Sequence, residues 1–395
     1  MSRGEKDYAG PSTTSVHGGE ERVKFAKSLI NPIAQTATYV FDDLDEVEAY
    51  TAGEREHFEY GRYGNPTQKT AERKIAALEH AEAALLFPTG MSPVTTVLLA
   101  MLRSGQHMII MEDCYRKTAQ FCNIIEKFGI ESTFVKPGDF EDLKAAVQSN
   151  TRIVFAESPT NPHLHVADLE QLVPFAREHR LKVLIDSTFA TPINQRPLEY
   201  NVDLVIHSAT KYLGGHNDLM AGCICGSASL VSAIKDFQKV CGGIVGPHTA
   251  YLLIRGLKTL ALRIARQNST ALQIAHFLEN REKVKRVYYP GLESHVDHQI
   301  AVEQMKGFGG VVSFEIDGDL ARTRDFIHAL EIPFIAPSLG GVESLVSHPA
   351  SVSYYDLSRE QRLAIGIKDE LVRYSVGIEE EDELIADIDQ ALNKI

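Results

Sequence analysis

Lys211 stands among hydroxyl-bearing residues at the end of a predicted strand, and this arrangement suits an aldehyde–phosphate cofactor. The apolar run Leu204–Ile206 predicts the strand, and HSATK (207–211) follows it directly. A lysine amine can form an imine with an aldehyde, while the Ser208 and Thr210 hydroxyls can donate hydrogen bonds to phosphate oxygens. Taken alone, a lysine after a strand is usually a solvated surface residue.

Asp186 is the second residue of this pattern. It follows the apolar run Val183–Ile185, which predicts another strand. Ligands of open α/β sheets bind at the carboxyl ends of the strands, so Asp186 and Lys211 are expected at one edge. A carboxylate there could pair with a pyridine nitrogen and keep it protonated. An aspartate that closes a strand is more often a helix cap, so the combination with Lys211 carries the prediction.

Two further segments could hold a phosphate. PTGM (88–91) places Gly90 and Met91 before a predicted helix, whose free N–H groups attract anions; an ordinary strand–turn–helix junction is the alternative. FEYGRYGNPT (58–67) offers Tyr60 and Arg62 as a charge-assisted clamp, although a structured turn would have the same composition. Neither G-x-G-x-x-G nor a P-loop pattern occurs, so nicotinamide and ATP sites lack sequence support.

Three residues could contact the cofactor ring or the substrate. Tyr115 follows the predicted strand His107–Met111 and could stack on a planar ring, unless it is a core tyrosine. Asn161, in ESPTNP (157–162), could reach a phenolic oxygen of the cofactor or a substrate carboxylate. Arg373 lies in an apolar strand context, where a guanidinium is costly unless an anion such as an α-carboxylate pairs with it.

The elements that must position these residues alternate between strand and helix. Apolar strands separated by helices of 10–15 residues indicate an α/β domain with a mainly parallel sheet. We predict an N-terminal arm over 1–66, a large domain over 67–255 and a C-terminal domain over 256–395, joined by one long helix over 252–280. The other predicted strands span 84–87, 132–135, 152–156 and 310–316, and the predicted helices span 67–79, 92–102, 121–128 and 320–330.

The composition and charge of the chain limit the kinds of partner that it is expected to bind. The 395 residues are 44% hydrophobic and 24% charged, with a net charge of −13 and no basic stripe, which argues against nucleic acids and anionic membranes. The apolar runs are shorter than a membrane span needs, and the polar start MSRGEKDYAG lacks a signal-peptide pattern, so a cytoplasmic location is expected. The five cysteines fit neither a disulfide framework nor a metal site; Cys223 and Cys225 should be buried on one strand face.

With these residues assembled, the chain resembles the cystathionine γ-synthase-like family of pyridoxal-phosphate enzymes from about Ser28 to the C-terminus. The resemblance implies the aspartate-aminotransferase-like fold type I and pyridoxal 5′-phosphate as cofactor. It rests on FEYGRYGNPT, PTGM, ESPTNP, DSTFATP, HSATKYLGGHND, RGLKTL and IAPSLGGVES, which occur in the family's order.

The family's roles carry over residue by residue. Lys211 would be the Schiff-base lysine and proton shuttle, Asp186 the partner of the ring nitrogen, and Tyr115 the stacking residue. A clamp reaching across subunits implies a dimer, and family members are usually dimers of dimers. The phosphate would be held by Gly90, Met91, Ser208 and Thr210, with Tyr60 and Arg62 from a neighbouring subunit, and the substrate carboxylate by Arg373, Ser338 and Asn161.

DCYRKT, AGCICGS and GFGGVVSFEIDGD resemble most the plant-type cystathionine γ-synthases. This predicts γ-replacement on an activated homoserine by cysteine. Lys117 stands where methionine γ-lyases carry a cysteine, and Arg116-Lys117 would favour a phosphate or carboxylate leaving group, unless the pair is simply solvated. Cystathionine γ-lyase, methionine γ-lyase, O-acetylhomoserine sulfhydrylase and a synthase with another nucleophile stay open. A cofactor-binding regulator without turnover, or a scaffold, would conflict with the complete set of catalytic residues.

Overall fold

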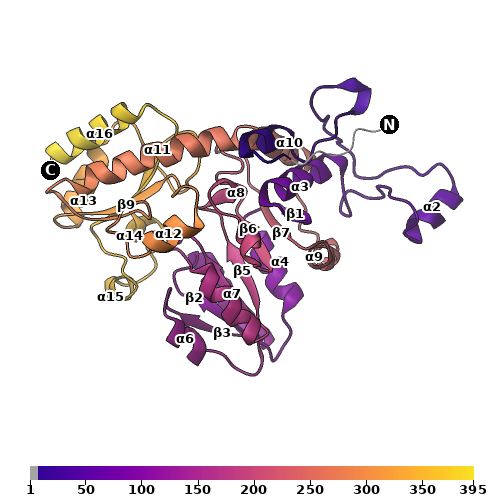
Figure 1. The fold of residues 1–395 in the computed structure, drawn as a ribbon, viewed down its shortest axis with the longest axis horizontal. Helices are drawn as coiled ribbons and strands as arrows, with labels where there is room; N and C mark the ends of the chain where they lie inside the picture. The colour runs from indigo at the N-terminus through magenta and orange to yellow at the C-terminus, as the bar shows by residue number, and fades with distance from the viewer. Residues whose placement is uncertain (1–7) are drawn as a thin grey trace.

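A seven-stranded sheet forms the centre of the molecule (Figure 1). The computed structural model describes residues 8–395. The strand order is β1-β7-β6-β5-β4-β2-β3, and β3, β2, β4, β5 and β6 run parallel, so the predicted mainly parallel sheet is confirmed. Antiparallel pairing joins β7 to β6 and to β1. The strands are β1 (Ala83–Phe87), β2 (His107–Met111), β3 (Glu131–Val135), β4 (Thr151–Glu157), β5 (Lys182–Asp186), β6 (Leu204–His207) and β7 (Gly222–Gly226).

Helices cover both faces of this sheet, and each face has its own core. In β7 the side chains of Cys223 and Cys225 lie in one core and Ile224 in the other, which confirms that the two thiols share a face. Cys241, by contrast, is exposed. One face is covered by α3 (Pro66–Glu79) and α7 (Leu169–Glu178), and the other by α4 (Met91–Met101), α5 (Arg116–Ile125) and α9 (Ala228–Cys241).

The helix predicted over 121–128 begins five residues earlier, at Arg116. Its first turn is formed by Arg116, Lys117 and Thr118, which are polar, so the apolar periodicity that predicted the helix is missing there. This shift matters because it makes Tyr115 the residue that precedes the helix and places Arg116 and Lys117 in its first turn. Shorter elements complete this part of the chain: α6 (Phe140–Ala145), α8 (Thr191–Asn194) and 3₁₀ turns at Phe25–Lys27, Glu126–Phe128 and Pro197–Tyr200.

The C-terminal part folds around a second sheet of five strands in the order β10-β11-β12-β9-β8. Only β10 and β11 pair in parallel; the other pairs are antiparallel. The strands are β8 (Val284–Tyr288), β9 (Val311–Ile316), β10 (Phe334–Ile335), β11 (Leu345–Ser347) and β12 (Leu371–Ser375), and the helices are α12 (His298–Gln304), α13 (Leu320–Ala329), α14 (Pro349–Val352), α15 (Arg359–Ala364) and α16 (Glu381–Asn393).

The single helix predicted over 252–280 is wrong, because the chain forms two helices, α10 (Pro247–Leu257) and α11 (Leu260–Glu279). Gly256 lies so close to the Gly214 carbonyl that an added Cβ would be 2.2 Å from its oxygen. The Arg263 guanidinium donates to the Gly256 carbonyl (3.0 Å) and to Thr259 Oγ1 (3.2 Å). The Gly256 carbonyl, which a continuous helix would pair with a backbone N–H, thus accepts a side-chain hydrogen bond at the break.

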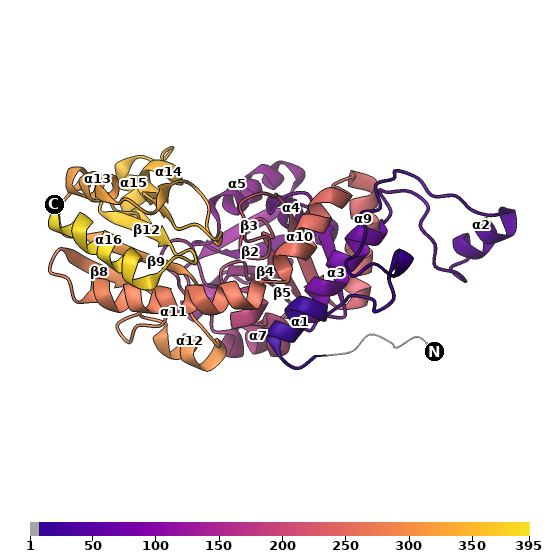
Figure 2. The same ribbon diagram turned by 90° about the horizontal axis from the view of Figure 1, so that it is seen from above.

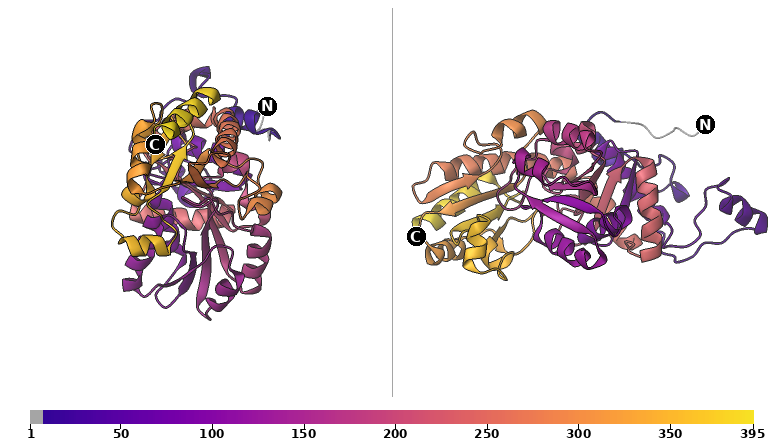
Figure 3. Two further views of the ribbon diagram at one scale, coloured as in Figure 1. Left: turned by 90° about the vertical axis from the view of Figure 1, so that its left-hand side faces the viewer. Right: turned by 90° about the horizontal axis from the view of Figure 1, so that it is seen from below.

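The N-terminal segment partly packs on the body and partly projects from it. Helix α1 (Pro11–His17) contacts α3 and α11, whereas α2 (Leu44–Thr51) lies away from the rest of the chain (Figures 2 and 3). Residues 1–7 of the predicted arm lie outside the described residues. The projecting part exposes large apolar side chains, among them Val23, Phe25, Leu29, Val40 and Leu44. Among residues 8–395, no helix combines the length and apolarity needed to cross a membrane.

Candidate active site

Lys211 lies in the loop that follows β6 of the large sheet, and this loop contacts the segment that follows β10 of the second sheet. Its Nζ donates to Ser338 Oγ at 2.9 Å, which joins the large sheet's loop to the segment after β10. Burial, reinforced by the nearby Arg373 charge, lowers the pKa of Lys211 to about 8. Near neutral pH the amine therefore exists partly in its nucleophilic, uncharged form. Ser338 has a φ of 133°, a conformation that costs energy for a side-chain-bearing residue and is typical of functional sites.

Asp186 ends β5 and is linked to the Lys211 loop through Thr188. The Thr188 hydroxyl donates to Asp186 Oδ1 at 2.6 Å and accepts the Ser208 N–H at 2.8 Å. The Thr188 N–H donates to the same carboxylate oxygen at 3.0 Å. Burial raises the pKa of Asp186, and the two hydrogen bonds that its carboxylate accepts from Thr188 oppose that effect. Sequence reasoning missed Thr188, although its position two residues after Asp186 permits this turn.

Gly90 and Ser208 lie so close together that a side chain at position 90 would clash with Ser208. A Cβ on Gly90 would lie 2.4 Å from Ser208 Oγ, so only glycine fits there. Gly90 also precedes α4, and the N-terminus of a helix carries the positive end of the helix dipole, which favours an anion. The small residue, the hydroxyl and the helix N-terminus suit a phosphate group. The Thr210 hydroxyl donates to the Ala221 carbonyl at 3.1 Å and accepts the Ala221 N–H at 3.0 Å, and its contact with a phosphate stays a prediction.

Arg373 of β12 is buried next to Lys211 and faces two predicted partners. Its Nη1 donates to Asn161 Oδ1 at 3.2 Å and its Nη2 to the Ser338 carbonyl at 2.8 Å. Nε is buried with no hydrogen-bond partner among the described residues. Burial lowers the pKa of Arg373, but a guanidinium stays charged at physiological pH. A half-satisfied buried cation beside the reactive amine suits a substrate carboxylate.

Tyr115 precedes α5, and its side chain is 44% exposed, which leaves the ring free to stack on a ligand. Its backbone N–H donates to Glu157 Oε2 at 2.7 Å. Arg116 forms an ion pair with Asp356 of the C-terminal part, with 2.6 Å between Nη2 and Oδ2. Lys117 is exposed and donates to Gln120 Oε1 at 2.8 Å. Of the predicted cationic pair, Lys117 is therefore the member that faces solvent without a carboxylate partner in the described structure.

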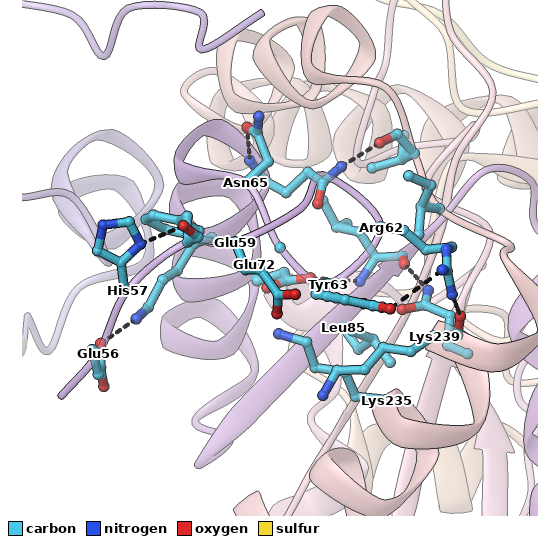
Figure 4. A pocket seen from close by; sticks show the side chains of 18 of the residues that line it. Glu56, His57, Glu59, Arg62, Tyr63, Asn65, Glu72, Leu85, Lys235 and Lys239 are labelled. Carbon is cyan, nitrogen blue, oxygen red and sulfur yellow. Dashed lines mark hydrogen bonds and ion pairs between the residues drawn. The ribbon is translucent and has the colours of Figure 1, made fainter. Parts of the chain in front are cut away.

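Tyr60 and Arg62 share no hydrogen bond with Lys211 within the described chain. Arg62 lines a cavity of about 490 Å³ between the arm and α9 (Figure 4). There its guanidinium donates to the Lys239 carbonyl and, at 3.3 Å, to Tyr63 Oη. Tyr60 is 43% exposed. The expectation that both residues serve a neighbouring subunit stays a prediction.

Known proteins resemble this chain along nearly its whole length. The model of the family described as "Cys/Met metabolism PLP-dependent enzyme" matches residues 12–393. "Cystathionine gamma-synthase 1, chloroplastic" of Nicotiana tabacum is 50% identical over 97% of this chain and 72% of its own. "L-methionine gamma-lyase" of Fusobacterium nucleatum subsp. polymorphum is 40% identical over 98% of both chains. The structure of cystathionine gamma-lyase from Lactobacillus plantarum, complexed with L-serine, superposes with a TM-score of 0.90 at 36% identity, covering 98% of this chain and 99% of that one.

These matches agree with the geometry at Lys211. A lysine of lowered pKa, a carboxylate on the neighbouring strand and a glycine–serine phosphate cradle are what the cofactor named by the family requires. The chain therefore belongs to the Cys/Met metabolism PLP-dependent enzyme family, and it is an α/β enzyme of fold type I that depends on pyridoxal 5′-phosphate.

Proposed function

We propose that the enzyme catalyses γ-replacement on an activated L-homoserine by L-cysteine, giving cystathionine. The observation that carries this proposal is the 50% identity, over nearly the whole chain, to plant relatives named cystathionine gamma-synthase. Relatives named methionine gamma-lyase or cystathionine beta-lyase are 40% identical, so elimination is the competing reaction.

The residues of the site take distinct parts in this reaction. Pyridoxal 5′-phosphate, when bound, supplies the electron sink that acidifies the substrate's Cα–H and Cβ–H bonds. Arg373 would bind the α-carboxylate with Nε, the donor left free by Asn161 and Ser338. The Lys211 amine would accept the α-proton and return protons, while Asp186 would hold a proton on the ring nitrogen. Overall, the Cγ–O bond of the activated homoserine breaks and the activating group leaves as phosphate or a carboxylate, while a Cγ–S bond forms and the thiol proton of cysteine is released to the leaving group or to solvent.

Lys117 is proposed to select the leaving group. It lies two residues beyond Tyr115 and is exposed in the first turn of α5. An ammonium there would attract a phosphate or succinate group more than a neutral acetyl group.

We therefore expect Lys117→Ala to raise KM for O-phosphohomoserine about tenfold, and to change KM for O-acetylhomoserine little, because only the anionic group loses an ion pair. Steady-state kinetics with cysteine as nucleophile would measure both values. The matched control is Lys127→Ala. Lys127 lies in the 3₁₀ turn that follows α5, and its ammonium group lies over the Phe128 ring. Equal effects of Lys117→Ala on the two donors would remove the argument for an anionic leaving group.

Assembly and location are part of the proposal. We infer a homo-oligomer, a dimer of dimers, in which Tyr60 and Arg62 complete the phosphate site of a neighbouring subunit. The exposed apolar side chains of the arm supply surface for such a contact. The cytoplasmic location stays a prediction, and because two plant relatives carry the word chloroplastic in their names, cell fractionation would test it.

A further inference from the structure

Two acidic side chains stand side by side at the carboxyl edge of the large sheet. Glu157 ends β4 and Asp186 ends β5, and the two residues are direct partners in the parallel register. Glu157 is only 5% exposed. Asp113, which follows β2, adds a third carboxyl group to the same region. Three negative charges in one poorly solvated region would repel one another strongly, so they cannot all be ionised at low cost.

The hydrogen bonds show which carboxyl group keeps a charge. Asp186 receives the Thr188 hydroxyl and N–H on one oxygen, and both bonds favour the ionised form. Glu157 receives only the Tyr115 N–H, at 2.7 Å. Burial first, and then the charges of Asp186 and Asp113, raise the pKa of Glu157 well above its usual range. The pKa of Asp113 rises, mainly through burial, to about 6.

The other titratable groups around Glu157 do not supply a neutralising partner. Burial, and to a lesser extent the charge of Glu157, raise the pKa values of Cys114 and Tyr354. Both side chains therefore remain protonated and uncharged at neutral pH. Arg373 donates to Asn161 and Ser338 and makes no hydrogen bond to Glu157 in the described structure.

We propose that Glu157 is a positioning residue that stays a neutral carboxylic acid and holds the Tyr115 backbone, and with it the stacking ring, in place. As a neutral acceptor it fixes the residue before α5 without adding a negative charge beside Asp186. Asp186 is thereby left as the carboxylate that can pair with a protonated ring nitrogen. The inference concerns the cofactor site and does not depend on whether the enzyme replaces or eliminates.

Infrared spectroscopy of the apoenzyme at pH 8 tests the protonation state directly, since Asp113 is ionised at that pH. We expect the spectrum to contain a protonated-carboxyl C=O band that disappears in Glu157→Gln. The matched control, Glu131→Gln, changes an exposed glutamate at the start of β3 and should leave the band unchanged. A wild-type spectrum from which Glu157→Gln removes only carboxylate bands would overturn the proposal.

Cofactor binding tests the positioning role. Glu157→Gln keeps an oxygen acceptor for the Tyr115 N–H and stays neutral, so its affinity for pyridoxal 5′-phosphate and the circular dichroism of the bound cofactor should match wild type within about twofold. Glu157→Ala leaves a buried N–H unpaired and should weaken affinity by about tenfold or more, with an altered dichroism signal. A Glu157→Gln protein as impaired as Glu157→Ala would show that the charge is needed, and would overturn the proposal. Neither readout involves turnover, so failure here leaves the proposed γ-replacement untouched.

Discussion

At the scale of single residues, the site depends on Lys211, whose protonated form is destabilised by burial and by a nearby positive charge. Lys211 is held by Ser338 and lies near the permanently charged Arg373, and its pKa falls to about 8. A surface lysine, with a pKa near 10.4, would be almost wholly protonated and a poor nucleophile at neutral pH. The environment, rather than the residue type, makes this amine reactive.

The rate at which apoenzyme captures pyridoxal 5′-phosphate covalently should follow this pKa. Because only the neutral amine attacks the aldehyde, the rate should rise with pH and level off above about 8. Stopped-flow absorbance of the cofactor would record it, and Lys211→Ala should show no covalent capture. A rate still rising steeply at pH 10 would mean that Lys211 behaves as an ordinary surface lysine.

Lys211, Asp186, Tyr115 and Asn161 could be identified from sequence because each follows or ends a strand that was itself predictable, whereas Ser338 was predicted only from the family resemblance. The structure brings Lys211, Ser338, Arg373 and Asn161 together in one connected set. Glu157 could not be found in this way, and the spacing of Thr188 from Asp186 indicates only its bonds to that carboxylate, not its bond to Ser208. The roles of Thr188 and Glu157 come from hydrogen bonds to Ser208 and Tyr115, partners 20 and 42 residues away in the chain, and no local pattern specifies such pairings.

At the scale of elements, the six strands predicted between residues 84 and 206 are present with bounds that move by at most one residue. Parallel strands buried on both faces read as uninterrupted apolar runs, and such runs are easy to recognise. The break between α10 and α11 was missed because Arg263 and the contact between Gly256 and Gly214 cause it. These are tertiary contacts, and they override a helical periodicity that is otherwise continuous.

Helix α3 is tied to β6 by a buried ion pair whose removal should be costly. His207 Nε2 lies 2.5 Å from Glu79 Oε1, and the two side chains are 1% and 0% exposed. We expect Glu79→Gln to destabilise the apoenzyme by about 3–5 kcal/mol near neutral pH, because it removes the negative charge that balances a protonated His207 in the interior. Urea unfolding measures the change. The half-exposed Glu199, which pairs with His80 and Arg196, is the control, and Glu199→Gln should cost less than about 1 kcal/mol.

The same pair predicts a dependence on pH. The pKa of His207 is raised to about 9, since the Glu79 charge outweighs the opposing effect of burial. A group whose pKa is raised by folding stabilises the folded state fully below its unfolded pKa, near 6.5 for histidine. The stability gap between wild type and Glu79→Gln should therefore be largest below pH 6.5 and shrink as the pH rises through 9. A gap that widened over this range would contradict the assignment.

At the scale of the whole molecule, the N-terminal segment has one anchored and one projecting part. Glu20 ties it to the body through Lys74 (3.1 Å) and Lys258 (3.0 Å). Beyond that anchor the chain exposes apolar side chains and carries α2 away from the body (Figure 2). The sequence predicted an arm here because residues 1–66 lack sustained periodicity.

Mixing two inactive variants tests whether active sites are shared between subunits. Lys211→Ala lacks the amine and Arg62→Ala lacks the proposed phosphate contact, so each should be inactive or nearly so alone. In a hybrid dimer one of the two sites combines an intact Lys211 with an intact Arg62 from the other subunit. Refolding an equal mixture should therefore restore about a quarter of wild-type activity. No recovery, with hybrids present by mass spectrometry, would place Arg62 and Lys211 in the same subunit's site or outside it.

The central claim, replacement rather than elimination, is tested most directly by the products formed from O-phospho-, O-succinyl- and O-acetylhomoserine, each with and without cysteine. We expect cystathionine to form only when cysteine is present, fastest from an anionic donor, with little 2-oxobutyrate or ammonia released. Methionine or cystathionine offered alone should be nearly inert. Rapid release of 2-oxobutyrate and ammonia that cysteine does not suppress would contradict the account and make the enzyme a γ-eliminating lyase.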